Sequence, residues 1–226
     1  MKNKSIIVIA GEPKSVFLEI FFKALRKNKF KSPIILICCK KILVEQMKKN
    51  KFKKKLNIIE EENLKNYKLN NNKINLINVE YSKFSKKLNY KLTNQYLIKS
   101  FKLALKIIKN DYSYKLINGP INKTSFLNKK FLGVTEYISK KCNIKNTGML
   151  IYNKDLSVCP LTTHLPLKLI HKKINKKLIE EKIQLINFFY KKKLKFKPKI
   201  CVTGMNKQCE SNLRFNDDDK IVSRAI

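Results

Sequence analysis

His164 is the side chain best suited to chemistry in this sequence, and it lies in the segment Leu156–Leu167, LSVCPLTTHLPL. The apolar run Leu156–Leu161 before it predicts a short buried strand, and Pro166 after it favours a first helical turn. His164 is therefore expected just past the carboxyl end of a strand, where open α/β sheets bind ligands. A neutral imidazole there suits metal binding or acid–base chemistry, and a loop histidine held by backbone hydrogen bonds is the alternative.

The cysteines point away from metal chemistry. The six cysteines include no CxxC pair, and four of them lie within apolar, strand-like segments: Cys38, Cys39, Cys159 and Cys201. This pattern predicts free, buried thiols in place of a zinc site or a disulfide framework.

Around these residues, apolar runs and helical periodicity alternate. Strands are expected at residues 5–10, 34–39, 74–79, 115–118, 148–152, 156–161 and 200–203. Helices are expected at residues 16–28, 42–52, 93–110 (with Thr93 as its cap), 135–142 and 174–191, while residues 53–73 allow no firm prediction. This alternation predicts an α/β fold, a mostly parallel sheet with flanking helices.

The net charge of +35 raises the question of nucleic-acid binding. However, 48 of the 51 basic residues are lysine, whereas arginine is the usual choice for bidentate recognition of phosphates and bases. The lysines are also spread along the chain, often beside asparagine, as in a composition drifting toward A/T-rich codons. We therefore expect no specific nucleic-acid partner, only weak binding at low salt.

Length and hydropathy indicate a globular protein. The 226 residues, 43% of them hydrophobic, are enough for one large domain or two small ones. No apolar run approaches the roughly 18 residues of a membrane span. The first apolar run, Ile6–Ala10, is too short for a signal peptide, so a cytoplasmic protein without membrane partners is expected.

Standard phosphate-binding loops are absent from the sequence. The five glycines lie at the edges of the expected elements, at Gly11, Gly119, Gly133, Gly148 and Gly204, where turns need them. Neither GxGxxG nor GxxxxGK[ST] occurs, so no cofactor-binding residue can be assigned, and no catalytic residue either.

Several segments together resemble the 4-hydroxythreonine-4-phosphate dehydrogenase family of vitamin B6 biosynthesis. They are Gly11-Glu12-Pro13, Asn118–Lys123 (NGPINK), Gly133–Tyr137 (GVTEY), Thr162–Leu167 (THLPL preceded by Thr162) and Gly204-Met205-Asn206. The resemblance spans essentially all of residues 1–226. It implies a two-domain fold like that of the isocitrate and isopropylmalate dehydrogenases, and a homodimer with its active site near the subunit interface.

The resemblance also implies a reaction. The substrate would be a phosphorylated hydroxy-amino acid, 4-phosphohydroxy-L-threonine, oxidised with NAD or NADP and then decarboxylated on the way to pyridoxal phosphate. A divalent metal (zinc, cobalt or magnesium) would lower the pKa of the substrate hydroxyl. His164 matches a metal-binding histidine of the family, Gln208 stands where a second one is expected, and Thr135 matches a threonine that contacts the substrate phosphate.

The sequence departs from the family pattern at several of these positions. Val134 replaces the histidine beside Thr135, and Gln208 replaces an imidazole with an amide. The family's C-terminal portion, with its third histidine, has no counterpart up to Ile226. Two alternatives to an active dehydrogenase therefore stay open. The first is an inactive truncated remnant, or one half of a split enzyme whose C-terminal part is a separate polypeptide. The second is a basic nucleic-acid-binding protein. His171 does not replace the third histidine and is expected at the surface.

Overall fold

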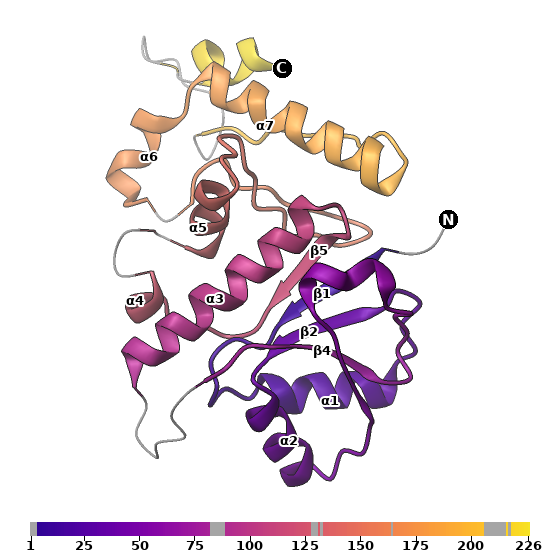
Figure 1. The fold of residues 1–226 in the computed structure, drawn as a ribbon. Coiled ribbons are helices and arrows are strands. Elements are labelled where there is room, and N and C mark those ends of the chain that lie inside the picture. Colours follow the sequence, from indigo (N-terminus) through magenta and orange to yellow (C-terminus); the bar gives the residue numbers. More distant parts are fainter. Residues whose placement is uncertain are drawn as a thin grey trace. The chain divides into compact units, whose positions relative to one another are not determined.

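The computed structural model describes residues 4–81, 89–127, 131, 133–163, 165–205, 216 and 218–226. The chain forms two compact units, Met1–Lys130 and Phe131–Ile226. Figure 1 shows a strand-containing first unit and a largely helical second unit.

The first unit is built on one parallel sheet. Its five strands are β1 (Ser5–Ile9), β2 (Ile34–Cys38), β3 (Leu56–Ile58), β4 (Ile74–Asn78) and β5 (Ser113–Asn118). They lie in the order β3-β4-β2-β1-β5, and each neighbouring pair is parallel. This confirms the α/β class and the mostly parallel sheet.

Helices connect these parallel strands: α1 (Phe17–Lys27), α2 (Lys40–Lys49), the short helix η1 (Glu61–Asn66) and α3 (Tyr90–Lys109). The short helix α4 (Lys123–Phe126) follows the last strand, β5. In Figure 1, α1 and α2 lie on one face of the sheet and α3 crosses the other. Right-handed crossovers explain this arrangement. The connections through α1 and α2 run from β1 toward β3, whereas the connection through α3 runs in the opposite direction, from β4 past β1 to β5. Crossovers of the same hand that run in opposite directions place their helices on opposite faces of the sheet.

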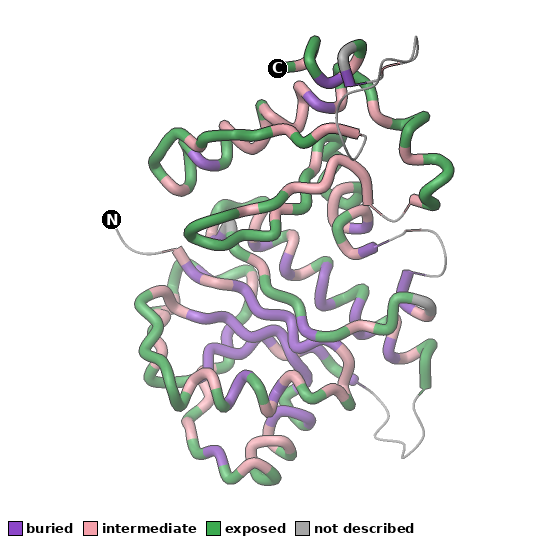
Figure 2. The backbone as a smooth tube through the Cα atoms, turned by 180° about the vertical axis from the view of Figure 1, so that it is seen from behind, coloured by how far each residue is buried: buried purple, intermediate pink, exposed green. Residues whose placement is uncertain are grey.

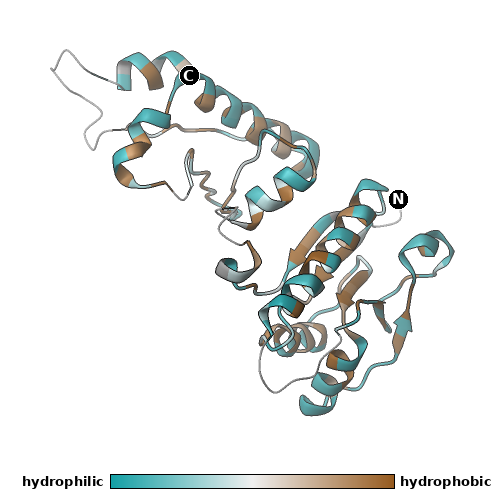
Figure 3. Ribbon diagram, turned by 60° about the vertical axis from the view of Figure 1, so that its left-hand side comes forward, coloured by the Kyte–Doolittle hydropathy of each residue, from teal (hydrophilic) through white to brown (hydrophobic). Residues whose placement is uncertain are grey.

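The core lies at the centre of this sheet. All five residues of β2 are buried, as a strand covered by helices on both faces requires. Phe22 of α1 and Phe101 of α3 are among the largest fully buried side chains. Buried backbone is concentrated on the central strands in Figure 2, and the same strands are coloured hydrophobic in Figure 3.

Asparagines tie down the amino ends of β2 and β4. The Asn75 side chain is 1% exposed; its Nδ2 donates to the carbonyl oxygens of Ile34 and Asn70 (2.9 Å each), and its Oδ1 accepts from Asn57 (3.0 Å). Asn71 accepts from the Ile34 N–H (2.9 Å) through its Oδ1. Part of the asparagine-rich stretch therefore supplies hydrogen bonds that a buried sheet edge needs.

The long helix α3 begins earlier than the sequence indicated. We expected Thr93 as its cap, but the cap is Asn89, whose side chain accepts from the Leu92 N–H (3.1 Å). Thr93 lies inside the helix, fully buried, with its hydroxyl 3.3 Å from that of Tyr81. At 20 residues α3 is amphipathic, and no helix among the described residues is long and apolar enough to cross a bilayer.

The second unit consists mainly of helices. They are α5 (Val134–Lys141), α6 (Leu167–Lys173), α7 (Lys176–Phe189), and the short turns η2 (Tyr190–Leu194), η3 (Asp218–Val222) and η4 (Ser223–Ala225). Ile179 of α7 is fully buried, and α7 packs against η3 and η4. The described residues of the second unit bury far fewer apolar side chains than those of the first unit do.

Three expected strands are not formed in this unit. The segments 148–152 and 156–161 do meet, but only through one antiparallel bridge between Ile151 and Val158, and residues 200–203 are irregular. Leu156 is 74% exposed, so the predicted buried strand before His164 is wrong. An apolar run becomes a strand only where neighbouring strands accept its hydrogen bonds, and the described residues of this unit provide no such ladder.

Replacing Asn75 tests the asparagine network. Asn75→Ala removes the three hydrogen bonds and leaves buried carbonyl groups without their donor, so we expect a loss of about 2 kcal/mol in the free energy of unfolding. Urea unfolding followed by circular dichroism measures it. Asn72→Ala is the matched control, because this neighbouring side chain is exposed and should change stability by less than about 0.5 kcal/mol. Equal effects of the two substitutions would contradict the assigned role of Asn75.

Candidate functional site

The strand order places a topological switch point between β1 and β5. The chain leaves β1 through α1 toward β2 on one side, whereas α3 returns the chain to β5 on the other side. In open α/β sheets the connections diverge at such a point and leave a crevice at the carboxyl ends of the strands, where ligands bind. The segments that follow these two strands are Gly11-Glu12-Pro13 and Gly119–Lys123, two of the motifs singled out in the sequence.

These two motifs are joined by hydrogen bonds. The Glu12 N–H donates to the Pro120 carbonyl (2.9 Å), and Glu12 Oε1 accepts from the Asn122 N–H (2.6 Å). Asn122 in turn caps the short helix α4 by accepting from the Ser125 N–H (3.1 Å). The sequence did not indicate that Glu12 and Asn122, 110 positions apart, form one loop structure.

Gly11 and Gly119 make this approach of the two loops sterically allowed. Gly11 has φ +77°, and a Cβ there would lie 2.5 Å from the Pro120 carbonyl oxygen. A Cβ at Gly119 would lie 2.3 Å from the Ala10 carbonyl oxygen and 2.9 Å from Cγ of Phe17. These separations are too short for any side chain, so the absence of Cβ atoms is what lets the loops close on each other.

The exposed rim of the switch point is positively charged. Lys14 and Lys123, one from each segment, are both exposed. Glu12 is half-buried and its carboxylate is engaged with the Asn122 backbone. The arrangement therefore favours an anionic ligand held by lysines and loop backbone, although these segments supply no imidazole or thiol.

A buried polar cluster follows the carboxyl end of β2. The Cys39 N–H donates to the Tyr96 hydroxyl (3.3 Å), and the ring of Tyr96 packs edge-on against Tyr81. Burial raises the pKa of the Cys38 thiol from its ordinary value of 9.0 to about 12, and burial also raises the pKa of Tyr96 well above its ordinary value. These groups stay protonated at neutral pH, so Cys38 is unsuited to act as a nucleophile.

The other described cysteines divide between partial burial and exposure. Cys39 is buried and Cys159 is partly buried, as free thiols. Cys142 and Cys201 are exposed, so the prediction of burial is wrong for Cys201, whose expected strand is not formed. Cys209 lies outside the described residues.

Of the three site residues predicted from the sequence, the structure describes one. Thr135 lies in the first turn of α5 and is exposed, which leaves its hydroxyl accessible to a ligand. His164 and Gln208 lie outside the described residues. His171 is exposed, as expected.

Glu136, next to Thr135, is not among the site residues predicted from the sequence. Its Oε2 is buried and has no hydrogen-bond partner among the described residues. An unpartnered buried carboxylate oxygen beside the GVTEY motif is unusual, because such atoms are nearly always satisfied. The only signal in the sequence was its position one residue after Thr135.

The residues on either side of position 164 line a cavity of about 390 Å³ in the second unit. Leu161, Thr162 and Leu165 contribute from the THLPL segment. The remaining lining residues come from the end of α6 and from α7 with its cap: Lys173, Asn175, Lys177, Leu178 and Glu181. The segment around position 164 therefore borders a cavity although no strand precedes it.

Metal-binding side chains are not gathered into a cluster in the described part of the chain. Among them no three His, Cys, Asp or Glu side chains converge as a metal site would require. A site made of His164 and Gln208 would have one imidazole and one amide oxygen, which is a weak donor set for zinc or cobalt. The predicted metal ligands thus fit a tight transition-metal site only if further ligands join them.

Comparison with known proteins identifies relatives of the whole chain. The family model described as pyridoxal phosphate biosynthetic protein PdxA matches residues 29–226. The 4-hydroxythreonine-4-phosphate dehydrogenase of Sulfurihydrogenibium sp. (strain YO3AOP1) is 29% identical over 228 residues, covering 98% of this chain and 69% of that protein. The enzyme of the same name from Aquifex aeolicus (strain VF5) is 30% identical over 212 residues, covering 90% of this chain and 63% of its own.

A solved structure of a protein with the same name as these relatives has a similar fold. The crystal structure of 4-hydroxythreonine-4-phosphate dehydrogenase from Klebsiella pneumoniae aligns with a TM-score of 0.84 at 21% identity, over 99% of this chain and 71% of that one. At this identity the likeness concerns the fold. The chain spans about two thirds of the length of the relatives it matches.

Gly119→Ala tests the close approach at the switch point. The added methyl group would meet backbone atoms of Ala10 that cannot move without shifting β1, so we expect unfolding to become easier by about 1–3 kcal/mol. Gly148→Ala is the matched control, because its methyl group would meet only side-chain atoms, at 3.1 Å or more. Urea unfolding compares the two variants, and an unchanged stability of Gly119→Ala would mean that the loops are not in contact.

Thiol reactivity tests the burial of Cys38. With iodoacetamide at pH 8 and under native conditions, we expect mass spectrometry to find Cys142 and Cys201 labelled and Cys38 protected. The Cys38 thiol has a pKa near 9 in the unfolded chain and about 12 in the folded one. The buried thiol therefore contributes its full stabilisation below pH 9, and this stabilisation is lost as the pH rises toward 12. Cys38→Ala should weaken this decline. Labelling of Cys38 as fast as that of Cys142 would contradict the buried environment.

Proposed function

The chain belongs to the PdxA family of pyridoxal phosphate biosynthetic proteins, and on that premise we propose that it acts in 4-hydroxythreonine-4-phosphate dehydrogenase chemistry. The reaction is the oxidation of 4-phosphohydroxy-L-threonine by NAD or NADP, followed by loss of carbon dioxide. The observation that carries the proposal is the family match over residues 29–226. The joined GEP and GPINK segments at the switch point support it, because ligands of α/β proteins bind there.

Two parts of the chain are assigned to the phosphorylated substrate. The exposed Thr135 hydroxyl donates a hydrogen bond to the substrate phosphate, in keeping with its position near the start of α5. Lys14 and Lys123 attract the anionic substrate or the cofactor phosphates to the switch point. Residues that hold the nicotinamide are not assigned, because the turn after β1 lacks a dinucleotide fingerprint.

The metal ion of the reaction is assigned to the complete enzyme and not to this chain alone. A divalent cation, zinc, cobalt or magnesium, supplies the acidity that lets the substrate hydroxyl lose its proton. His164 contributes one imidazole and Gln208 one amide oxygen, and the proposal requires further ligands from elsewhere.

Activity is proposed to need the part of the relatives that this chain does not cover. The solved relative extends beyond the aligned region by about three tenths of its length. Apolar side chains around the bridge in the second unit are exposed, namely Met149, Ile151, Tyr152, Leu156 and Val158. Such exposed groups favour a covering partner, either the further polypeptide of a split enzyme or the second copy in a homodimer. An inactive remnant is the alternative.

Calorimetry and a dehydrogenase assay test the proposal together. With a polypeptide equivalent to the uncovered part of the Klebsiella enzyme added in trans, we expect NAD(P)-dependent turnover of 4-phosphohydroxy-L-threonine and micromolar binding of zinc or cobalt. His164→Ala should reduce turnover at least 100-fold and weaken metal binding, because it removes the one imidazole assigned to the site.

His171→Ala serves as the control, since this exposed histidine should leave both readings unchanged. The chain without the added polypeptide should bind metal weakly and turn over slowly. Metal binding that survives His164→Ala would refute the assigned ligand. A folded complex with neither activity nor metal binding would favour the inactive remnant.

A further inference from the structure

The amino edge of the sheet carries a concentrated positive charge. Three connectors lead into the amino ends of β2, β3 and β4, namely residues 28–33, 50–55 and 68–73. Together they contain eight lysines and no aspartate or glutamate. Because the strands are parallel, these connectors share one edge, opposite the switch point. The acidic Asp111 before β5 pairs with Lys4 and does not belong to these connectors.

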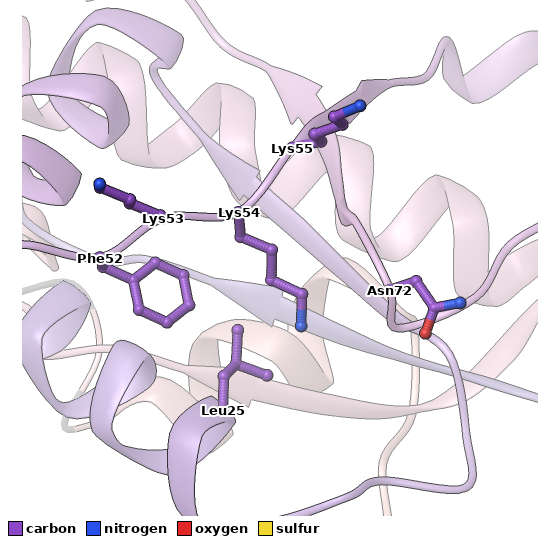
Figure 4. A pocket seen from close by; sticks show the side chains of 6 residues that line it. All are labelled: Leu25, Phe52, Lys53, Lys54, Lys55 and Asn72. Atoms are coloured by element: carbon purple, nitrogen blue, oxygen red, sulfur yellow. The ribbon is translucent and has the colours of Figure 1, made fainter.

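A groove of about 720 Å³ opens among these connectors. Its lining comprises Leu25 at the end of α1, Phe52, Lys53, Lys54 and Lys55 before β3, and Asn72 before β4. Figure 4 shows the Lys54 side chain extending toward Leu25, while Lys53 and Lys55 extend from the chain on either side of it. The groove thus has an apolar floor, one ammonium group inside it and two more at its rim.

The Lys54 ammonium has no anionic partner among the residues that the structure describes. Lys54 is half-buried, and none of the ion pairs among the described residues involves Lys53, Lys54 or Lys55. A cation partly removed from water without a counter-charge is unfavourable, and its neighbours of like charge add to the repulsion. A bound anion would relieve both costs at once.

The groove favours a compact anion over a nucleic-acid strand. Single-stranded nucleic acids use exposed aromatic rings as stacking platforms. The ring of Phe52 is stacked on Phe22, with 4.6 Å between centroids, and the Arg26 guanidinium lies 5.4 Å from its centre. The Arg26 guanidinium group donates to the carbonyl oxygens of Asn50 and Lys51, so it is not directed at a ligand. Neither base stacking nor bidentate arginine recognition is offered here.

We propose that this groove is a second ligand site, which binds a small molecule carrying two or three linked phosphates. The Lys54 ammonium contacts the phosphates inside the groove, and the field of Lys53 and Lys55 strengthens their binding. Asn72, whose side chain makes no hydrogen bond to the described residues, supplies an amide donor. The site is separate from the switch point and does not depend on the proposed dehydrogenase reaction.

Titration with inorganic tripolyphosphate tests this site on the full chain. At 0.15 M salt we expect saturable one-to-one binding by calorimetry that Lys54→Gln weakens at least fivefold. Lys102→Gln is the matched control: it removes the same charge from an exposed position on α3, and should change the affinity less than twofold. Lys54→Gln should unfold at the same temperature as the unmodified chain or at a higher one, because the substitution removes an uncompensated charge and no ion pair among the described residues.

Three outcomes would overturn the proposal. Absence of saturable binding at millimolar tripolyphosphate would mean that the groove holds no such ligand. Equal weakening by Lys54→Gln and Lys102→Gln would mean that only net charge attracts the anion. Tighter binding of a short single-stranded oligonucleotide, also weakened by Lys54→Gln, would make the groove a nucleic-acid site.

Discussion

The contact between the turns that follow β1 and β5 is the constraint on which the rest of the first unit depends. Gly11 and Gly119 lie so close to the opposite backbone that no side chain fits at either position. Their approach lets Glu12 bind the backbone of Asn122, which in turn caps α4. Two short motifs from distant parts of the sequence thereby meet at the carboxyl end of the sheet, where exposed Lys14 and Lys123 add positive charge.

The two units are stabilised to very different extents by their described residues. The first unit covers both faces of a parallel sheet and satisfies the amino ends of β2 and β4 with asparagine side chains. The second unit buries few apolar groups and exposes others around the Ile151–Val158 bridge. Hydrophobic burial supplies most of the free energy of folding, so the second unit is the one that gains from a covering partner.

The large positive charge is not distributed evenly over the fold of the first unit. At the amino edge, three connectors carry lysines without acidic residues, and the Lys54 ammonium lies in a groove. At the carboxyl edge, by contrast, the two motifs include Glu12, engaged with backbone, beside two exposed lysines.

The sequence by itself determined the α/β class, four of the five parallel strands of the first unit within two residues, and the family; β3 lies in residues 53–73, for which the sequence allowed no firm prediction. Continuous apolar runs such as Ile34–Cys38 report burial on both faces, which is a local property of the chain. Only the tertiary structure decided that Asn89 caps α3, that the apolar run before His164 stays exposed, and that Glu12 meets Asn122. Each of these depends on partners distant in the sequence: a strand needs a neighbouring strand to accept its hydrogen bonds, a cap depends on where packing lets the helix begin, and the Glu12–Asn122 contact forms because the sheet places the ends of β1 and β5 side by side.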